Sequence, residues 1–125
     1  MTGKVIIGST DISNLVVEGT YKVDMKEQYT AWADGNNITH RSNRYSKLAG
    51  SFDVILCDKV GMTIADLNTL IEGLKASTGA VLCAFYCTNT GSVEAVNAFL
   101  HLDSKDHILT TDGFIDVVTI EVEQR

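Results

Sequence analysis

The chain contains no proline in 125 residues, only three cysteines, and fewer basic than acidic side chains. Proline is one of the usual means of keeping an exposed sheet edge from pairing with another chain. Sheet edges here must therefore be protected by charge or covered by partners. The cysteines, Cys57, Cys83 and Cys87, are odd in number, and their spacings match neither a disulfide framework nor a paired zinc motif. We interpret them as reduced, mostly buried small hydrophobic residues.

The charge balance excludes two classes of partner. Ten Lys and Arg against 16 Asp and Glu give a net charge of -6 and a pI near 4.8. Nucleic acids and anionic membranes are bound through clustered basic side chains, so a general binder of either is not expected. No run approaches the ~18 consecutive apolar residues of a membrane helix, and the first apolar run is too short for a signal peptide. The sequence predicts synthesis in the cytoplasm.

The remaining composition is that of an ordinary globular protein. Hydrophobic residues make up 45% and charged residues 21%, and the mean hydropathy is +0.08. A chain of 13.6 kDa is long enough to bury a core without disulfides or a metal. We expect one domain over residues 1–125.

Two segments alternate apolar and polar residues with the period of a β-strand. The first runs from Leu15 to Met25, where Gly19 predicts a bulge or bend. The second has its apolar residues at even positions from Leu48 to Leu56. Each predicts a strand with one buried face, and we expect the two strands to pair.

One helix is predicted, with Thr63 as N-cap and Asp66 in its first turn. Its apolar residues recur at helical spacing: Ile64, Leu67, Leu70, Ile71 and Leu74. Gly73 lies inside this pattern and costs about 1 kcal/mol relative to Ala. We therefore expect another part of the chain to pack closely against that turn.

The rest of the chain predicts further strands. A short strand at Lys4–Ile7 precedes turn residues at 8–11. Three more are predicted after the helix, at Ala80–Thr88, Ser92–Leu102 and Gly113–Glu123. The first two are joined by a compact turn and the last two by a connection over 103–112, and Asp116 is expected at a sheet edge or interface. Strands, one helix and strands again predict a mainly β (α+β) fold, an antiparallel sandwich or barrel with one packed helix.

A polar stretch at about 33–46 interrupts the alternation between the two long strands. We predict an extended loop at the tip of their hairpin, with Asp34 and Gly35 as turn residues. Such a long connection usually binds something or is disordered. We expect an assembly surface made by seven residues: Trp32, Asn36, Asn37, His40, Arg41, Arg44 and Tyr45. The two aromatic residues flank the stretch and are candidate interface anchors.

Other chemistry at the polar stretch has less support. His40, Arg41 and Arg44 could bind a small anion, but polar side chains at a hairpin tip are mostly solvated or touch a partner protein. Asn37-Ile38-Thr39 matches a glycosylation sequon, which we take as chance because no secretory signal precedes it.

No catalytic, cofactor or metal site is predicted. His101, Asp103 and His107 lack the spacing that makes a zinc site specific. Cys83 and Cys87 would lie about 13 Å apart along one strand, too far for direct pairing. Neither group points to a reaction or a bound ion.

The layout of the chain resembles the small tail proteins of tailed bacteriophages and prophages, which share the tail-tube type of fold. The resemblance rests on a Gly-Ser-Thr-Asp hairpin, a long alternating strand, the polar segment THRSNRYSK, a second long strand, one capped helix, and the ending GFIDVVTIEVEQR. It covers nearly the whole chain.

The resemblance implies a structural virion protein that self-assembles into a ring, usually hexameric, or a tube. The polar loop would then reach a neighbouring subunit or ring, where Arg41 and Arg44 would meet acidic residues. The other implied partners are further tail proteins, with DNA only in passing through an acidic lumen, and no membrane. The protein would be located in the virion tail.

Three alternatives stay open at this point. The chain could be a tail terminator, head-tail connector, distal tail adaptor or baseplate component. It could also be a small-ligand-binding β-barrel module whose helix closes one end, with Trp32 and Tyr45 near the mouth. An enzyme that uses Cys57 or a histidine has the least support.

Overall fold

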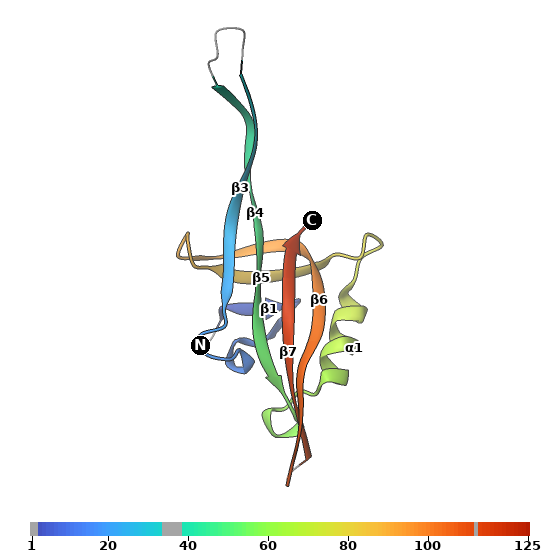
Figure 1. Cartoon of the computed structure of the whole chain (residues 1–125). Coiled ribbons are helices and arrows are strands. Elements are labelled where there is room, and N and C mark those ends of the chain that lie inside the picture. The colour runs from blue at the N-terminus through green and yellow to red at the C-terminus, as the bar shows by residue number, and fades with distance from the viewer. Residues whose placement is uncertain (1–2, 34–38, 112) are drawn as a thin grey trace.

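The computed structural model describes residues 3–33, 39–111 and 113–125, with side chains described outside 27–46. Figure 1 shows a β-rich body with a helix beside it and long hairpins that extend from it. The elements in chain order are β1 (Val5–Ile7), β2 (Thr10–Asp11), the short 3-10 helix η1 (Ser13–Leu15), β3 (Lys22–Ala33), β4 (Thr39–Leu56), the short 3-10 helix η2 (Asp58–Val60), α1 (Ile64–Leu74), β5 (Val81–Cys87), β6 (Ser92–Thr110) and β7 (Gly113–Gln124).

The prediction of a mainly β fold with one packed helix is confirmed. In the described residues, seven strands form one antiparallel sheet in the order β2-β1-β5-β6-β7-β4-β3. The expected pairing of the two long strands is present, with Lys22 opposite Ser51 in β3 and β4.

Strand β6 folds the sheet into two halves. Its residues 92–98 pair with β5, and its residues 98–110 pair with β7. Figure 1 shows the first part of β6 running beside β5 across the body and the second part running along β7. A strand that passes from one half to the other in this way makes a corner, which lets the two halves face each other over a core.

The turn after β5 makes hydrogen bonds to β3, the strand at the far edge of the sheet. The amide of Thr88 donates to the carbonyl of Val23 at 3.1 Å. The Asn89 side chain accepts from the Met25 amide at 3.0 Å and donates to the Met25 carbonyl at 2.7 Å. The two halves are therefore joined at β6 and again at the start of β3.

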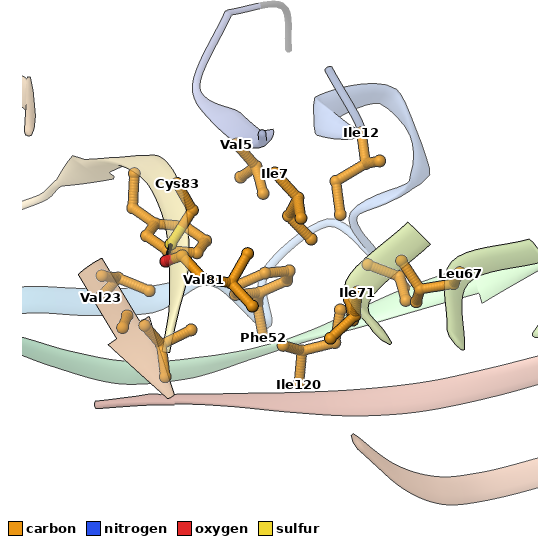
Figure 2. Packing of buried hydrophobic residues seen from close by; sticks show 14 of the residues in the cluster. Val5, Ile7, Ile12, Val23, Phe52, Leu67, Ile71, Val81, Cys83 and Ile120 are labelled. Carbon is orange, nitrogen blue, oxygen red and sulfur yellow. Dashed lines mark hydrogen bonds between the residues drawn. The ribbon is translucent and has the colours of Figure 1, made fainter. Parts of the chain in front are cut away.

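Apolar side chains from both halves and the helix fill the space between them. The alternation predicted in β4 is confirmed, since Leu48, Phe52, Val54 and Leu56 are all buried. Phe52 lies between Tyr21 and Phe85, with ring centroids 5.4 Å and 6.0 Å away. Figure 2 shows further members of this cluster, among them Val5, Ile7, Ile12, Val23, Leu67, Ile71, Val81, Cys83 and Ile120.

The prediction of a strand from Leu15 to Met25 is wrong in its first half. Residues 13–15 form η1, Gly19 lies in a turn at φ +82°, and β3 begins only at Lys22. Alternation alone does not supply a partner strand. Here the segment touches β4 at single points, as where the Val17 amide donates to the Asp53 carbonyl at 2.8 Å.

The predicted connection over 103–112 is also wrong. Strand β6 continues to Thr110, and β7 starts at Gly113. The polar residues of this segment suit a strand because most of them are exposed. A register shift between Ser104 and Asp106 makes Lys105 the extra residue of a β-bulge.

Helix α1 begins as predicted. The Thr63 hydroxyl accepts from the Asp66 amide at 3.3 Å, and the Asp66 carboxylate accepts from the Thr63 amide at 3.1 Å. This capping box satisfies two donors that a helix start leaves unpaired. The expected close packing at Gly73 is wrong, because a Cβ there would meet nothing within 4 Å.

Replacing Thr63 by Ala should lower the free energy of unfolding by about 1 kcal/mol, because it removes the N-cap acceptor. The melting temperature should fall by about 3–6 °C. Thr69→Ala is the matched control, since Thr69 is exposed within the same helix. Thermal unfolding of both variants checks this, and equal effects would contradict a capping role.

Candidate assembly surface

The polar stretch is mainly strand and not an extended loop. Strand β3 continues to Ala33 and β4 starts at Thr39, so the predicted loop at 33–46 is wrong for residues 39–46. The residues pair across the hairpin up to Ala33 opposite Thr39. Polar side chains are compatible with this conformation because a ribbon outside the body needs no apolar face.

Among the residues that the structure describes, no third strand pairs with this ribbon where it projects from the body. We call it the arm and define it as residues 26–33 of β3 and 39–47 of β4. In the described part of the chain, β4 pairs with β7 only from Ala49 onward. Eight residues of strand span about 24 Å, and Figure 1 shows the two strands extending far beyond the rest of the sheet.

The arm therefore has two open edges. Each edge offers a row of backbone N–H and C=O groups that can pair with a further strand. A two-stranded ribbon by itself is only marginally stable in water. The arm is thus the part of the fold that gains most from a partner.

The structure brings most of the predicted site residues onto this ribbon. Trp32 pairs with His40, Ala31 with Arg41, and Gln28 with Tyr45. The two aromatic residues therefore lie at different levels of the arm and do not flank a loop.

Of the remaining predicted site residues, one lies at a β-bulge and two lie outside the described part of the chain. Arg44 lies where the register shifts between Gln28 and Thr30, a β-bulge on the β4 side. Asn36 and Asn37 lie outside the described residues.

A trough at the root of the arm is a feature that the sequence reasoning missed. It has a volume of about 420 Å³ and lies over the small residues Ala49, Gly50 and Ser51 of β4. Lys26 and Lys47 line one part, and Glu121 and Glu123 another. The small residues Ala49 and Ser51 were the available signal, because they lie on one face of the strand and leave that face hollow.

A buried carboxylate beside the trough was also missed. Asp53 lies at an odd position of β4, on the face opposite the predicted apolar one, but it is only 7% exposed. Lys105 donates to one carboxylate oxygen at 2.8 Å, and the Thr119 hydroxyl donates to the other at 2.7 Å. Hydrogen bonds from Lys105 and then from Thr119 hold the pKa of Asp53 below its usual range. The bulge at Lys105 explains the contact and could not be read from the sequence.

The Asp53 contacts should make stability depend on pH. A carboxyl whose pKa is lower folded than unfolded, where it is about 3.9, stabilises the fold fully above about pH 5. That contribution is lost as the pH falls through the folded pKa. Asp53→Asn should therefore be about 1 kcal/mol less stable at pH 7, and the difference should shrink toward pH 3.

Denaturant unfolding between pH 3 and pH 7 measures this difference. Glu121→Gln is the control, because it removes an exposed carboxylate from the same face of the sheet. A difference between Asp53→Asn and the parent that is the same at both pH values would contradict the assignment.

The histidine and acid candidates are not brought together into one site. His101 Nε2 lies 3.0 Å from an oxygen of Asp103, whereas His107 contacts Asp116 on the neighbouring strand. The bulge at Lys105 changes which face of the strand later residues occupy. Among the described residues, no three His, Cys, Asp or Glu side chains gather closely enough to hold a metal ion.

The interpretation of the cysteines is confirmed. All three are free thiols, Cys83 and Cys87 are buried, and Cys57 is partly buried. Burial raises the pKa of the Cys83 thiol to about 12 and raises that of Cys87 as well. Both side chains therefore stay protonated at neutral pH and serve as core residues.

Comparisons of the chain with models of protein families, with curated proteins and with solved structures found no match. No helix in the described part of the chain is long and apolar enough to cross a membrane.

Proposed function

We propose that this chain is a structural protein of a phage tail that self-assembles through its arm into rings or a tube. The observation that carries the proposal is the two-stranded arm with both edges open beyond Lys26 and Lys47. The resemblance of the element order to tail-tube-type proteins supplies the class of assembly. The proposal includes no catalytic role.

Physical chemistry favours self-association at such an arm. Extended chains add to open sheet edges through main-chain hydrogen bonds, and side chains at alternate positions give specificity. Natural proteins guard long edges with proline, short strands, charged side chains, β-bulges or a cover, and the arm carries basic side chains and a bulge. This chain has no proline, and its arm strands are long. A partner strand would satisfy the open backbone groups.

The ligand-binding alternative receives less support from the fold. The space that a barrel ligand would occupy holds Phe52, Phe85 and Ile120, all buried. Trp32, once a candidate for the mouth of a barrel, lies in β3 on the arm, opposite His40. A ligand site near these aromatic residues would lie outside the core.

The mass of the purified protein in solution tests the proposal. Light scattering over a concentration range should show assemblies much larger than 13.6 kDa, and negative-stain microscopy should show rings or tubes. A monomer at every concentration would contradict self-assembly. Retention of a small molecule in place of assembly would favour the ligand-binding module.

A further inference from the structure

The hairpin of β6 and β7 ends in a second projecting ribbon, at the opposite end of the body from the arm (Figure 1). We call it the tip and define it as residues 106–111 and 113–116. Strand β4 ends at Leu56, opposite Asp116, so in the described residues β7 has no β4 partner before that point. The tip is therefore a two-stranded ribbon as well.

Large apolar side chains are exposed on this tip. Leu109 is 70% exposed, Phe114 is 53% exposed and Ile108 is 49% exposed. Leu109 lies opposite Phe114, and Ile108 lies opposite Ile115 on the next rung, so each face of the ribbon carries one apolar pair. Grouped exposed apolar side chains are typical of a surface that binds a protein.

The apolar row on the tip continues the core. In β7, Val118, Ile120 and Val122 are buried, and Phe114 lies in the same alternating row, separated from Val118 by Asp116. The body covers the buried end of this row, and the row reaches the surface at Phe114. The ring of His107 stacks on Phe114 at 4.2 Å and also contacts Asp116. These contacts hold the Phe114 ring in place before any partner binds.

A pocket of about 210 Å³ lies at the base of the tip, beside Phe114 and Cys57. Its volume is below the about 300–1,000 Å³ of small-molecule sites. It suits one side chain of a protein partner better than a free ligand. Interface anchors commonly fill such pockets.

Charge complementarity favours a second copy of this chain as the partner. The arm segments carry four basic residues, Lys26, Arg41, Arg44 and Lys47, and one acidic residue, Glu27. The tip segments carry the exposed Asp106 and the mostly buried Asp116 and no Lys or Arg, and Asp58 and Lys59 both line the pocket at the base of the tip. Opposite charge on two surfaces steers their encounter and fixes their register.

We infer that the tip of one copy is the surface on which the arm of a second copy docks. The inference rests on the proposed self-assembly and names the surface that receives the arm. Since arm and tip are different surfaces at opposite ends of the body, each docked copy leaves one arm and one tip free. Such a head-to-tail contact continues from copy to copy, as a stack or tube requires.

Mixing two complementary variants tests the docking. An arm-shortened variant, in which Asn-Gly replaces residues 29–44, keeps the tip, and Ile108→Ser with Leu109→Ser keeps the arm. Each variant alone should fail to bind itself, whereas the mixture should form a complex in which one tip holds one arm. Titration calorimetry should show that the same mixture binds at least about tenfold more weakly at high salt, because salt screens exposed charges beyond about 10 Å at 0.1 M.

Leu82→Ser is the matched control, because Leu82 is 59% exposed on β5, away from the tip. It should assemble like the parent chain. Equal loss with Leu82→Ser, or full assembly by the tip variant, would overturn the inference. If the tip variant assembles while the arm-shortened variant does not, self-assembly through the arm stands and only the docking surface is wrong. A parent chain that is monomeric throughout would overturn both.

Discussion

The arm-shortened variant is expected to fold like the parent chain and to remain monomeric where the parent assembles. Asn-Gly in place of residues 29–44 joins Gln28 to Tyr45, which already pair across the hairpin. Asn-Gly is a favoured two-residue hairpin turn. The described contacts of the arm lie within its own hairpin, so its loss should change the free energy of unfolding by only about 1 kcal/mol.

Circular dichroism, thermal unfolding and light scattering together measure this outcome. The control replaces Arg41 and Arg44 by Lys, which keeps the length and charge of the arm. It should fold and assemble, although Lys lacks the planar donor fork of Arg and binding should weaken. Assembly of the arm-shortened variant at the parent's concentration would show that the interface lies elsewhere.

Gly50→Ala is expected to destabilise the protein more than any other substitution considered. A Cβ at Gly50 would lie 2.0 Å from the Lys22 carbonyl oxygen and 2.6 Å from Val23 Cα. Both are backbone atoms of β3, which is held by its pairing with β4 and by the bond from Thr88 to Val23. Strand β3 would have to move away, at a cost of about 3 kcal/mol.

Denaturant unfolding should show that loss, with a melting temperature lower by about 10 °C or more. The matched control is Gly73→Ala, where a Cβ meets nothing within 4 Å. It should stabilise the protein by about 0.5–1 kcal/mol, because Ala is the better helix former. Equal stability of Gly50→Ala and the parent chain would mean that β3 does not approach β4 so closely.

The two predictions concern neighbouring parts of one hairpin. Gly50 lies where β3 and β4 leave the body, and the arm begins three residues away in sequence, at Lys47. The root of the hairpin is fixed by backbone packing, whereas the described contacts of the arm are the hydrogen bonds between its own two strands. The stable body thus presents an arm whose open edges remain available to a partner.

Several elements could be predicted because local patterns determine them. The capping box at Thr63 and Asp66 depends on four consecutive residues, and the buried face of β4 depends on simple alternation. The pairing of the two long strands followed from their order along the chain. These features need little information from distant parts of the molecule.

Other elements could not be predicted, because partners far apart in sequence decide them. The polar segments at 39–46 and 103–110 have weak strand patterns, yet each is a strand because a neighbour pairs with it. The contact of Asp53 with Lys105 joins residues 52 positions apart and depends on a bulge. No periodicity signals such a contact.

The sequence by itself determined that this protein is mainly β, with one capped helix, a buried apolar face on β4 and cysteines that act as core residues. Alternation, capping residues and composition are properties of the sequence itself, so they can be read without knowing which segments meet in the fold. Only the tertiary structure decided that β6 turns a corner, that Gly50 lies against β3, and that an arm and an apolar tip project at opposite ends. These depend on which strands meet and where each pairing ends.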